Sequence, residues 1–321
     1  MYKFTHVNAT SVADAAATLA KGKAQVIAGG TDLMCYMRGM FTLNPPATIV
    51  NIKSIPNLDY IKEEGGTLKI GALATLTDIA NNATVKSKYT ALSEAARKVG
   101  SLELRNVGTI GGNISQKPRC RYYRNDYNSF SCVRKNPNGI CYALAGVNDE
   151  HSIFGAVGGC VAVCPSDVAP ALLALDASIV TNKKTWKAAD FFVPTGEQIN
   201  ALAADEIITE VQVPTPAAGT KSTYVKFAFR KAIDFPLVSA AVVVTSAGGT
   251  VSNASIALGG VHGSPRKATS AETSIKGKAI DATSAEAAGA AAATGATTLA
   301  LNKYKVQITK TMVKRALLAV K

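Results

Sequence analysis

Cysteine is the residue type with the clearest chemical pattern in this chain of 321 residues. Five of the six cysteines fall between Cys120 and Cys164, far more than an even spread would place there. Thiolates are soft ligands, and four of them suit either zinc or an iron–sulfur cluster. Structural zinc sites usually use two close cysteine pairs, whereas only Cys160 and Cys164 form one here. The wide, irregular spacing therefore favours a cubane, with buried thiols or disulfides as the alternative.

Two glycine-containing segments predict loops that could hold phosphate. Gly29-Gly30 follows a short apolar stretch at 25–28 and precedes an apolar helical stretch, and the second loop covers 108–113. Main-chain N–H groups in such turns can bind the negative charge of a pyrophosphate. Neither loop has the G-x-G-x-x-G or P-loop pattern, so a Rossmann site and a P-loop are both unsupported. Either pair taken by itself is equally compatible with an ordinary turn.

The remaining polar residues point away from hydrolysis. The chain has three scattered histidines and neither a G-x-S-x-G nor an H-E-x-x-H motif, so acid–base hydrolysis is poorly supported. Lys226, Arg230 and Lys231 place positive charge at the end of a predicted strand. Such charge can be a solvated strand terminus, or it can lie near a flavin ring, where it would stabilise the reduced anionic form.

Alternating helical and strand patterns must position the N-terminal glycine loop. Ser11 to Asp14 form a capping box for a helix to about residue 20, and strands are expected at 25–28 and 47–52. This order predicts a small parallel α/β lobe. A strand is also expected at 67–73 and a helix at 91–99, whereas 117–150 has no clear period. A loop this long inside a compact domain suggests that a bound metal cluster organises it.

The C-terminal third predicts a separate α+β domain. The stretch 214–220, rich in Pro, Ala and Gly, is the best candidate linker. Beyond it, the sequence predicts strands and then two helices, with the strands at 223–229, 238–246 and 254–258 and the helices at 283–301 and 310–320.

Composition excludes some classes of protein and leaves others open. Apolar residues make up 47% of the chain, which is enough for a sizeable core and excludes disorder throughout. No apolar stretch is long enough to predict a membrane span. The net charge of +13 would suit nucleic acid, an acidic partner or an anionic cofactor. The N-terminus lacks the pattern of a signal peptide, so the cytoplasm is expected, or the periplasm if a partner carries the export signal.

Six stretches, spread in order over nearly the whole chain, resemble the FAD-binding (medium) subunit of the molybdenum hydroxylases, the xanthine dehydrogenase and carbon monoxide dehydrogenase family. They are VIAGGTDL (26–33), LRNVGTIGGN (104–113), PSDVAPALLALDA (165–177), DEIITEVQVP (205–214), KFAFRKAIDFPLV (226–238) and ALGGV (257–261). The resemblance implies an α+β fold. A two-lobed FAD-binding domain at 1–216, with a small parallel lobe (about 1–55) and a larger mixed or antiparallel β lobe (56–216), precedes an α+β domain at 221–321.

The resemblance also implies the residues that bind FAD. The first glycine loop would wrap the pyrophosphate, and the second would complete the phosphate and ribityl contacts. One acidic residue would bind the sugar portion, and an apolar residue and a lysine would lie near the flavin ring. In this chain they are Ile27, Ala28, Gly29, Gly30, Thr31, Asp32 and Leu33 in the first loop, Thr109, Gly112, Asn113, Ser115 and Gln116 in the second, and then Asp167, Ile208 and Lys226.

The cysteine-rich insertion at about 117–160 resembles only part of that family. It is similar to the flavin subunits of 4-hydroxybenzoyl-CoA reductase and of periplasmic-type aldehyde oxidoreductase, which carry an additional [4Fe–4S] cluster. The similarity implies Cys120, Cys132, Cys141 and Cys160 as the four ligands and leaves Cys164 as a spare thiol.

The function implied is electron transfer rather than substrate hydroxylation. A large molybdopterin subunit would carry the substrate chemistry, and a small [2Fe–2S] subunit would connect it to this FAD. A further carrier such as ferredoxin could exchange electrons with the [4Fe–4S] cluster. Three alternatives remain open at this stage: a self-contained flavin oxidoreductase, a basic nucleic-acid-binding protein and a disulfide-stabilised exported binding protein. The low aromatic content and the lack of a reader motif argue against the second.

Overall fold

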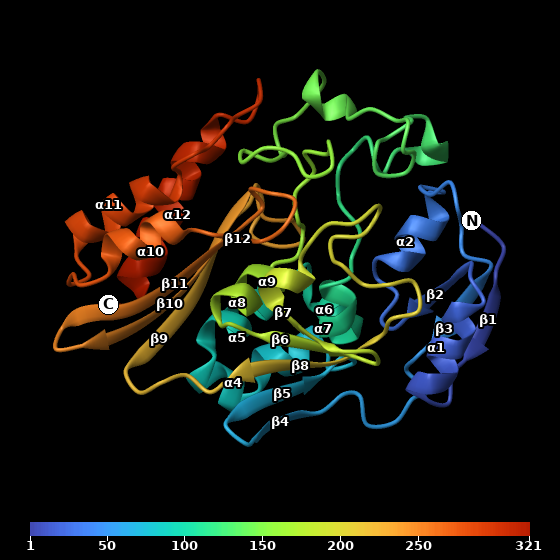
Figure 1. The fold of residues 1–321 in the computed structure, drawn as a ribbon, viewed down its shortest axis with the longest axis horizontal. Coiled ribbons are helices and arrows are strands. Elements are labelled where there is room, and N and C mark those ends of the chain that lie inside the picture. The colour runs from blue at the N-terminus through green and yellow to red at the C-terminus, as the bar shows by residue number, and fades with distance from the viewer.

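The computed structural model describes all of residues 1–321. Three sheets follow one another along the chain, one parallel and two antiparallel (Figure 1). The parallel sheet lies at the N-terminal end of an elongated molecule, and the C-terminal sheet with its helices lies at the opposite end (Figure 1). The chain is therefore an α+β protein with a parallel and an antiparallel sheet ahead of an α+β C-terminal region, as the sequence predicts.

The N-terminal lobe is a β-α-β-α-β unit. It consists of β1 (Thr5–Asn8), α1 (Val12–Ala20), β2 (Ala24–Ile27), α2 (Leu33–Arg38) and β3 (Thr48–Asn51). The Ser11 side chain accepts a hydrogen bond from the N–H of Asp14, which begins α1 as predicted. The strand order is β1-β3-β2, so β3 is central. The Gly29-Gly30 loop follows the carboxyl end of β2, the edge at which open α/β sheets bind ligands.

The middle lobe is built on a five-stranded antiparallel sheet of order β4-β5-β8-β6-β7. Apolar residues of this sheet pack with α5 and α8 into the largest core of the protein. Its elements are β4 (Ile61–Glu64), β5 (Thr67–Gly71), α3 (Leu76–Asn81), α4 (Ala83–Lys88), α5 (Thr90–Arg97), α6 (Leu102–Val107), α7 (Ile110–Asn113), α8 (Val168–Ala174), β6 (Ser178–Thr181), β7 (Thr185–Lys187), α9 (Ala188–Phe191) and β8 (Ile208–Pro214).

The cysteine-rich segment between α7 and α8 has little regular structure. Its only helical elements are two short 3-10 turns, η1 (Asp126–Asn128) and η2 (Tyr142–Leu144). Figure 1 shows the segment in green, between α2 and the C-terminal helices. The segment, which has no hydrophobic period in its sequence, thus also lacks long helices and strands in the structure.

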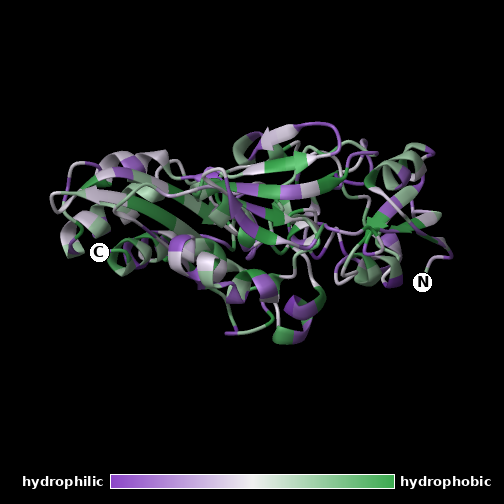
Figure 2. Cartoon of the chain, turned by 90° about the horizontal axis from the view of Figure 1, so that it is seen from below, coloured by the Kyte–Doolittle hydropathy of each residue, from purple (hydrophilic) through white to green (hydrophobic).

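The C-terminal region is a four-stranded antiparallel sheet of order β12-β11-β10-β9 with three helices. One face packs against these helices, and the other contacts α5 and α8 of the middle lobe. Figure 2 shows hydrophobic stretches (green) along these strands. The elements are β9 (Thr220–Phe227), β10 (Val238–Ala247), β11 (Thr250–Gly259), β12 (Arg266–Lys267), α10 (Thr269–Ile275), α11 (Ala282–Ala292) and α12 (Tyr304–Ala319).

The two predicted C-terminal helices have different bounds from those expected. The alanine-rich helix ends at Ala292 rather than near residue 301, and Gly295 follows with φ +78°. Glycine adopts this left-handed conformation without the cost that a Cβ imposes, so the chain can turn at Gly295 instead of continuing as a helix towards residue 301. The last helix begins at Tyr304 rather than at residue 310. None of the helices combines the length and the apolar character that crossing a membrane requires.

Candidate functional site

A cleft of about 350 Å³ lies where the first glycine loop meets the middle lobe. Every residue predicted to bind the cofactor contributes to its wall, except Ile208 and Lys226. The two glycine-containing segments, which are far apart in the sequence, therefore form one site. Ile208 lies buried in the main core on β8 and is not among the lining residues, and its contact with a flavin ring stays a prediction.

The first glycine loop offers a row of free hydrogen-bond donors. The main-chain N–H groups of Gly29, Gly30, Thr31 and Asp32 donate to no acceptor within the protein. Gly30 has φ +70°, and a Cβ on Gly29 would fall 1.9 Å from the carbonyl oxygen of Val107. The loop is thus glycine-rich because it turns sharply and passes directly over the chain before the second loop. Successive unpaired N–H groups of this kind suit a phosphate group.

The second glycine segment is a short helical turn rather than the loop that the sequence predicts. Thr109 caps α7, accepting a hydrogen bond from the N–H of Gly112 at 3.1 Å. The amide oxygen of Asn113 accepts a hydrogen bond from the Ser166 hydroxyl at 2.5 Å, and its main-chain carbonyl accepts one from the Gln116 side chain at 2.9 Å. Asn113 and Gln116 are both buried, so these bonds fix the wall of the cleft.

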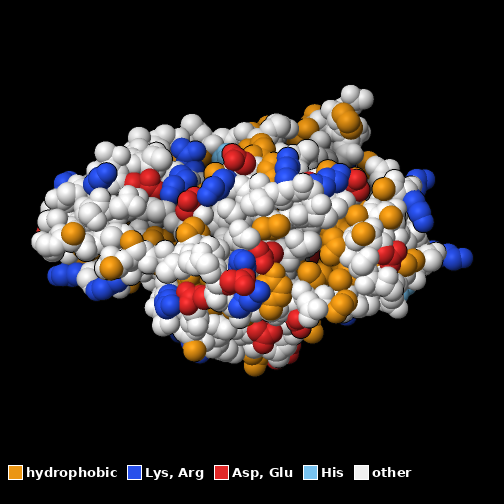
Figure 3. Space-filling view, turned by 60° about the horizontal axis from the view of Figure 1, so that its bottom comes forward, with side chains coloured by type: hydrophobic (Ala, Val, Ile, Leu, Met, Phe, Trp, Pro, Cys, Tyr) orange, Lys and Arg blue, Asp and Glu red, His pale blue; other side chains and the backbone are white.

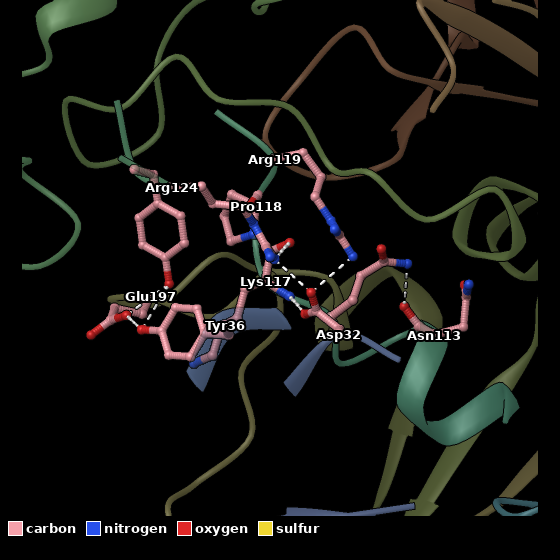
Figure 4. Close-up of polar contacts among 10 residues, drawn as sticks. Asp32, Tyr36, Asn113, Lys117, Pro118, Arg119, Arg124 and Glu197 are labelled. Atoms are coloured by element: carbon pink, nitrogen blue, oxygen red, sulfur yellow. Dashed lines mark hydrogen bonds and ion pairs between the residues drawn. The ribbon is translucent and has the colours of Figure 1, made fainter. Parts of the chain in front are cut away.

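The Asp32 carboxylate, in the first loop, is surrounded by basic residues (Figure 4). Its carboxylate accepts hydrogen bonds from the N–H of Lys117 at 2.7 Å and from Arg124 at 2.6 Å, and forms an ion pair with Arg119 at 2.8 Å. Burial lowers the pKa of Lys117 and lowers that of Arg119 to about 10. Two cationic side chains, Lys117 and Arg119, also line the cleft, where an anionic ligand would meet them.

Asp167 forms a buried polar centre deeper in the site. Lys226 Nζ lies 2.7 Å from one carboxylate oxygen, and the Tyr224 hydroxyl donates to the other at 2.5 Å. Burial raises the pKa of Asp167 in spite of the adjacent lysine. Each carboxylate oxygen has a second lone pair, so Asp167 can accept up to two further bonds from a ligand. Lys226 contacts the site through Asp167 and does not line the cleft itself.

The structure adds lining residues that the sequence did not single out. Ile233 and Phe235 reach the cleft from the segment after β9, and the N–H of Ile233 donates to the carbonyl oxygen of Gly100 at 3.0 Å. The Arg119 guanidinium lies 4.5 Å from the centre of the Phe235 ring. These positions fall inside the stretch 226–238, whose family resemblance was the one signal that could have identified them.

The four predicted ligand cysteines lie in one region, and none is in a disulfide. Cys141 and Cys160 share a hydrogen bond, which lowers the pKa of Cys141 to about 6 and raises that of Cys160. Burial raises the pKa of Cys120 to about 11, and the neighbouring thiolate charges of Cys132 and Cys141 act in the same direction. No group of three or more His, Cys, Asp or Glu side chains is close enough to hold a metal ion. The geometry therefore does not establish the expected iron–sulfur cluster.

The other two cysteines have different surroundings. Cys164 belongs to the main hydrophobic core, and complete burial raises its pKa to about 12. Cys35 is exposed on α2 and lines the same cleft as the first glycine loop. Neither interacts with the four cysteines of the insertion.

Comparisons with known proteins identify the family of this chain. The sequence profile of the FAD binding domain in molybdopterin dehydrogenase matches residues 2–216, and that of the CO dehydrogenase flavoprotein C-terminal domain matches residues 223–320. The chain belongs to the family of FAD-binding medium subunits of molybdenum hydroxylases. It is an oxidoreductase subunit of such a complex, and its cofactor is FAD.

Individual relatives cover most of the chain. The aldehyde oxidoreductase FAD-binding subunit PaoB of Escherichia coli K12 is 33% identical over 285 residues, which are 86% of either protein. The carbon monoxide dehydrogenase medium chain of Hydrogenophaga pseudoflava is 28% identical over 98% of this chain and 96% of its own. A solved structure of that carbon monoxide dehydrogenase, lacking the Mo-pyranopterin moiety, matches with a TM-score of 0.78 and 28% identity, covering 99% of this chain and 97% of that one.

Proposed function

We propose that this chain is the flavin-bearing electron relay of a heterotrimeric molybdenum hydroxylase. It would pass electrons between a molybdopterin-binding large subunit with its [2Fe–2S] small subunit and an external acceptor or donor such as ferredoxin. The observation that carries the proposal is the row of unpaired N–H groups at Gly29 to Asp32 in the wall of the cleft. FAD supplies the capacity to accept and release one or two electrons when it is bound.

The residues of the cleft would divide the binding of FAD among them. The N–H groups of residues 29–32 would hold the pyrophosphate, with Lys117 and Arg119 neutralising its charge. Thr109, Gly112, Asn113, Ser115 and Gln116 would complete the phosphate and ribityl contacts, and Asp167 would accept a bond from the sugar portion. The Lys226 ammonium would act through Asp167, since it is bonded to that carboxylate rather than exposed in the cleft.

We further propose that Cys120, Cys132, Cys141 and Cys160 hold a [4Fe–4S] cluster. The support is their separation from the hydrophobic core that buries Cys164, and the main-chain N–H groups that approach each of their sulfurs. N–H bonds to ligand sulfurs are a common means of tuning such clusters. A cubane also spreads its four ligands more widely than a single ion does, which is compatible with cysteines that do not converge on one point.

The substrate of the complex would bind to the large subunit rather than to this chain. The relatives named above act on different substrates, since one is an aldehyde oxidoreductase and the other a carbon monoxide dehydrogenase.

On the face shown in Figure 3, basic and acidic side chains are interspersed, so the net charge of +13 is not gathered into one patch there. We propose the stretch 215–219, between β8 and β9, as the junction between the FAD-binding domain and the C-terminal domain.

The test is the cofactor content of the complex purified without oxygen. We expect one FAD and four additional iron atoms per medium chain in the wild-type protein. Cys160→Ala should lose these four irons and retain FAD, whereas Cys164→Ala, only a few residues away, should retain both. Equal iron content in wild type and Cys160→Ala would overturn the cluster, and a complex that folds and assembles without flavin would overturn the relay.

A further inference from the structure

One imidazole lies against a cysteine of the proposed cluster. His151 Nε2 is 3.2 Å from Cys120 Sγ, and the histidine is only 4% exposed. The other ring nitrogen, Nδ1, is buried and has no hydrogen-bond partner. The ring packs near Tyr122, with 6.5 Å between the ring centres. Of the three histidines in the chain, His151 alone makes a hydrogen bond to a cysteine sulfur.

The direction of this hydrogen bond follows from the chemistry of a ligand sulfur. A cysteine that binds iron is a thiolate and has no proton to give. The hydrogen between Nε2 and Sγ must therefore belong to the imidazole, so His151 donates and Cys120 accepts. A donated hydrogen bond stabilises negative charge on the sulfur, and the reduced cluster is the more negative form.

The C-terminal helix α12 and the residues before it hold the main chain of His151 in place. The His151 carbonyl oxygen accepts hydrogen bonds from Lys305 Nζ at 2.9 Å and from Asn302 Nδ2 at 3.2 Å. Lys305 also donates to the carbonyl oxygens of Glu150 at 3.0 Å and Gly260 at 2.6 Å. The side chains of Asn302 and Lys305 are both fully buried. The position of the imidazole is thus set by a part of the chain more than 150 residues away.

We propose that His151 is a positioning residue that donates a hydrogen bond to Cys120 and raises the reduction potential of the cluster, and that Asn302 and Lys305 fix it there. The inference rests on the proposed [4Fe–4S] cluster. It assigns the C-terminal region a second role besides packing against the middle lobe, because that region orients a group next to the redox centre.

The experiment is EPR-monitored redox titration of the medium chain in the anaerobically purified complex. His151→Leu removes the donor and keeps an apolar side chain of moderate size, so we expect a lower midpoint potential with iron content unchanged. A tenfold fall in the reduced-to-oxidised ratio at a given potential corresponds to a shift of about 59 mV for a one-electron couple. His151→Gln, which keeps an N–H donor, should restore part of the shift.

His262→Leu is the matched control. His262 is half-buried, and its ring bonds to the Ser264 hydroxyl at 3.0 Å rather than to a sulfur. An unchanged midpoint in a His151→Leu protein that retains its four irons would overturn the role of His151 and leave the cluster intact. A wild-type complex without these irons would instead overturn the cluster, and the role of His151 with it.

A measurement on the wild-type protein covers the case in which His151→Leu fails to load iron. Electron–nuclear double resonance of the reduced cluster, in protein labelled with ¹⁵N-histidine, should show a weak nitrogen coupling and an exchangeable proton. The His151→Gln protein should lose the labelled nitrogen signal. Absence of any histidine coupling in the wild type would contradict the proposal.

Discussion

The Asp167 carboxylate and the Lys226 ammonium form an ion pair of 2.7 Å in which both side chains are almost fully buried. The pair joins the residue that precedes α8 in the middle lobe to β9 of the C-terminal sheet, beside the wall of the cleft. A buried pair of this kind contributes little when intact, but removing one partner leaves the other charge uncompensated. Lys226 and Asp167 therefore act as one unit, and neither can be substituted independently.

Lys226→Met is expected to destabilise the protein by about 3–5 kcal/mol at neutral pH, since Asp167 remains buried without its counter-charge. Burial already raises the pKa of Asp167, and loss of the lysine raises it further. The folded state then holds this proton more tightly than the unfolded state, so stability falls as pH rises through that pKa. The substitution should lower the free energy of unfolding only slightly near pH 4 and most strongly near pH 7.

Urea unfolding at both pH values measures this effect, and the double variant Lys226→Met/Asp167→Asn is the control. We expect the double variant to recover a large part of the loss at neutral pH. A double variant whose loss is simply the sum of the two single losses would show that the residues are not coupled.

Gly29→Ala is expected to weaken FAD binding by at least about fivefold. The new methyl group would lie 1.9 Å from the Val107 carbonyl oxygen, so the loop would have to move, and overpacking of this kind typically costs about 1–3 kcal/mol. Gly263→Ala is the control, because its Cβ would lie outside the cleft with its nearest neighbour, a side-chain methyl of Val157, at 3.2 Å and its nearest main-chain atom at 3.5 Å. Flavin fluorescence titration measures the FAD affinity of the two variants, and equal affinities would contradict the position given to the first loop.

Lys305→Met is expected to remove a pH-dependent part of the stability. Burial lowers the pKa of Lys305 to about 7 from an ordinary value of 10.5. Between these values the unfolded chain holds more protons than the folded one, so wild-type stability should gain a contribution as pH rises from 7. Urea midpoints at about pH 7 and pH 9.5 should show this rise in the wild type and in the exposed Lys303→Met control, but not in Lys305→Met.

Tyr123→Phe is expected to loosen the cysteine-rich insertion. The hydroxyls of Tyr36 and Tyr123 both donate to the carboxylate of Glu197, the second at 2.7 Å, and burial raises the pKa of both phenols. Loss of a hydrogen bond to a charged group costs about 1.5–3 kcal/mol. Tyr127→Phe, in the same insertion but 80% exposed, should have no effect. Thermal unfolding of the two variants gives the comparison, and equal midpoints would contradict a supporting role for Glu197.

The sequence predicted the elements that have a strong local signal. The cap at Ser11 and the apolar strands around the Gly29-Gly30 loop produce the N-terminal lobe through local preferences and periodicity. The two glycine segments were predicted to share a ligand, and the structure brings both into one cleft. These features depend on short stretches of chain, which sequence patterns describe well.

Other parts of the site depend on contacts between distant residues. The approach of Gly29 to Val107, the pairing of Asp167 with Lys226 and the contact of His151 with Cys120 all join separate segments of the chain. No periodicity in a single sequence specifies such pairs. Ile208 and Lys226 were assigned to the site from the resemblance alone; neither lines the cleft, and their place near the flavin ring stays a prediction.

The most direct test of this account is an experimental structure of the anaerobically prepared complex. It should show the FAD pyrophosphate within hydrogen-bond distance of the N–H groups of Gly29, Gly30, Thr31 and Asp32, and a four-iron cubane bonded to Cys120, Cys132, Cys141 and Cys160. Flavin bound elsewhere, or these four cysteines free of iron in a complex prepared without oxygen, would contradict it.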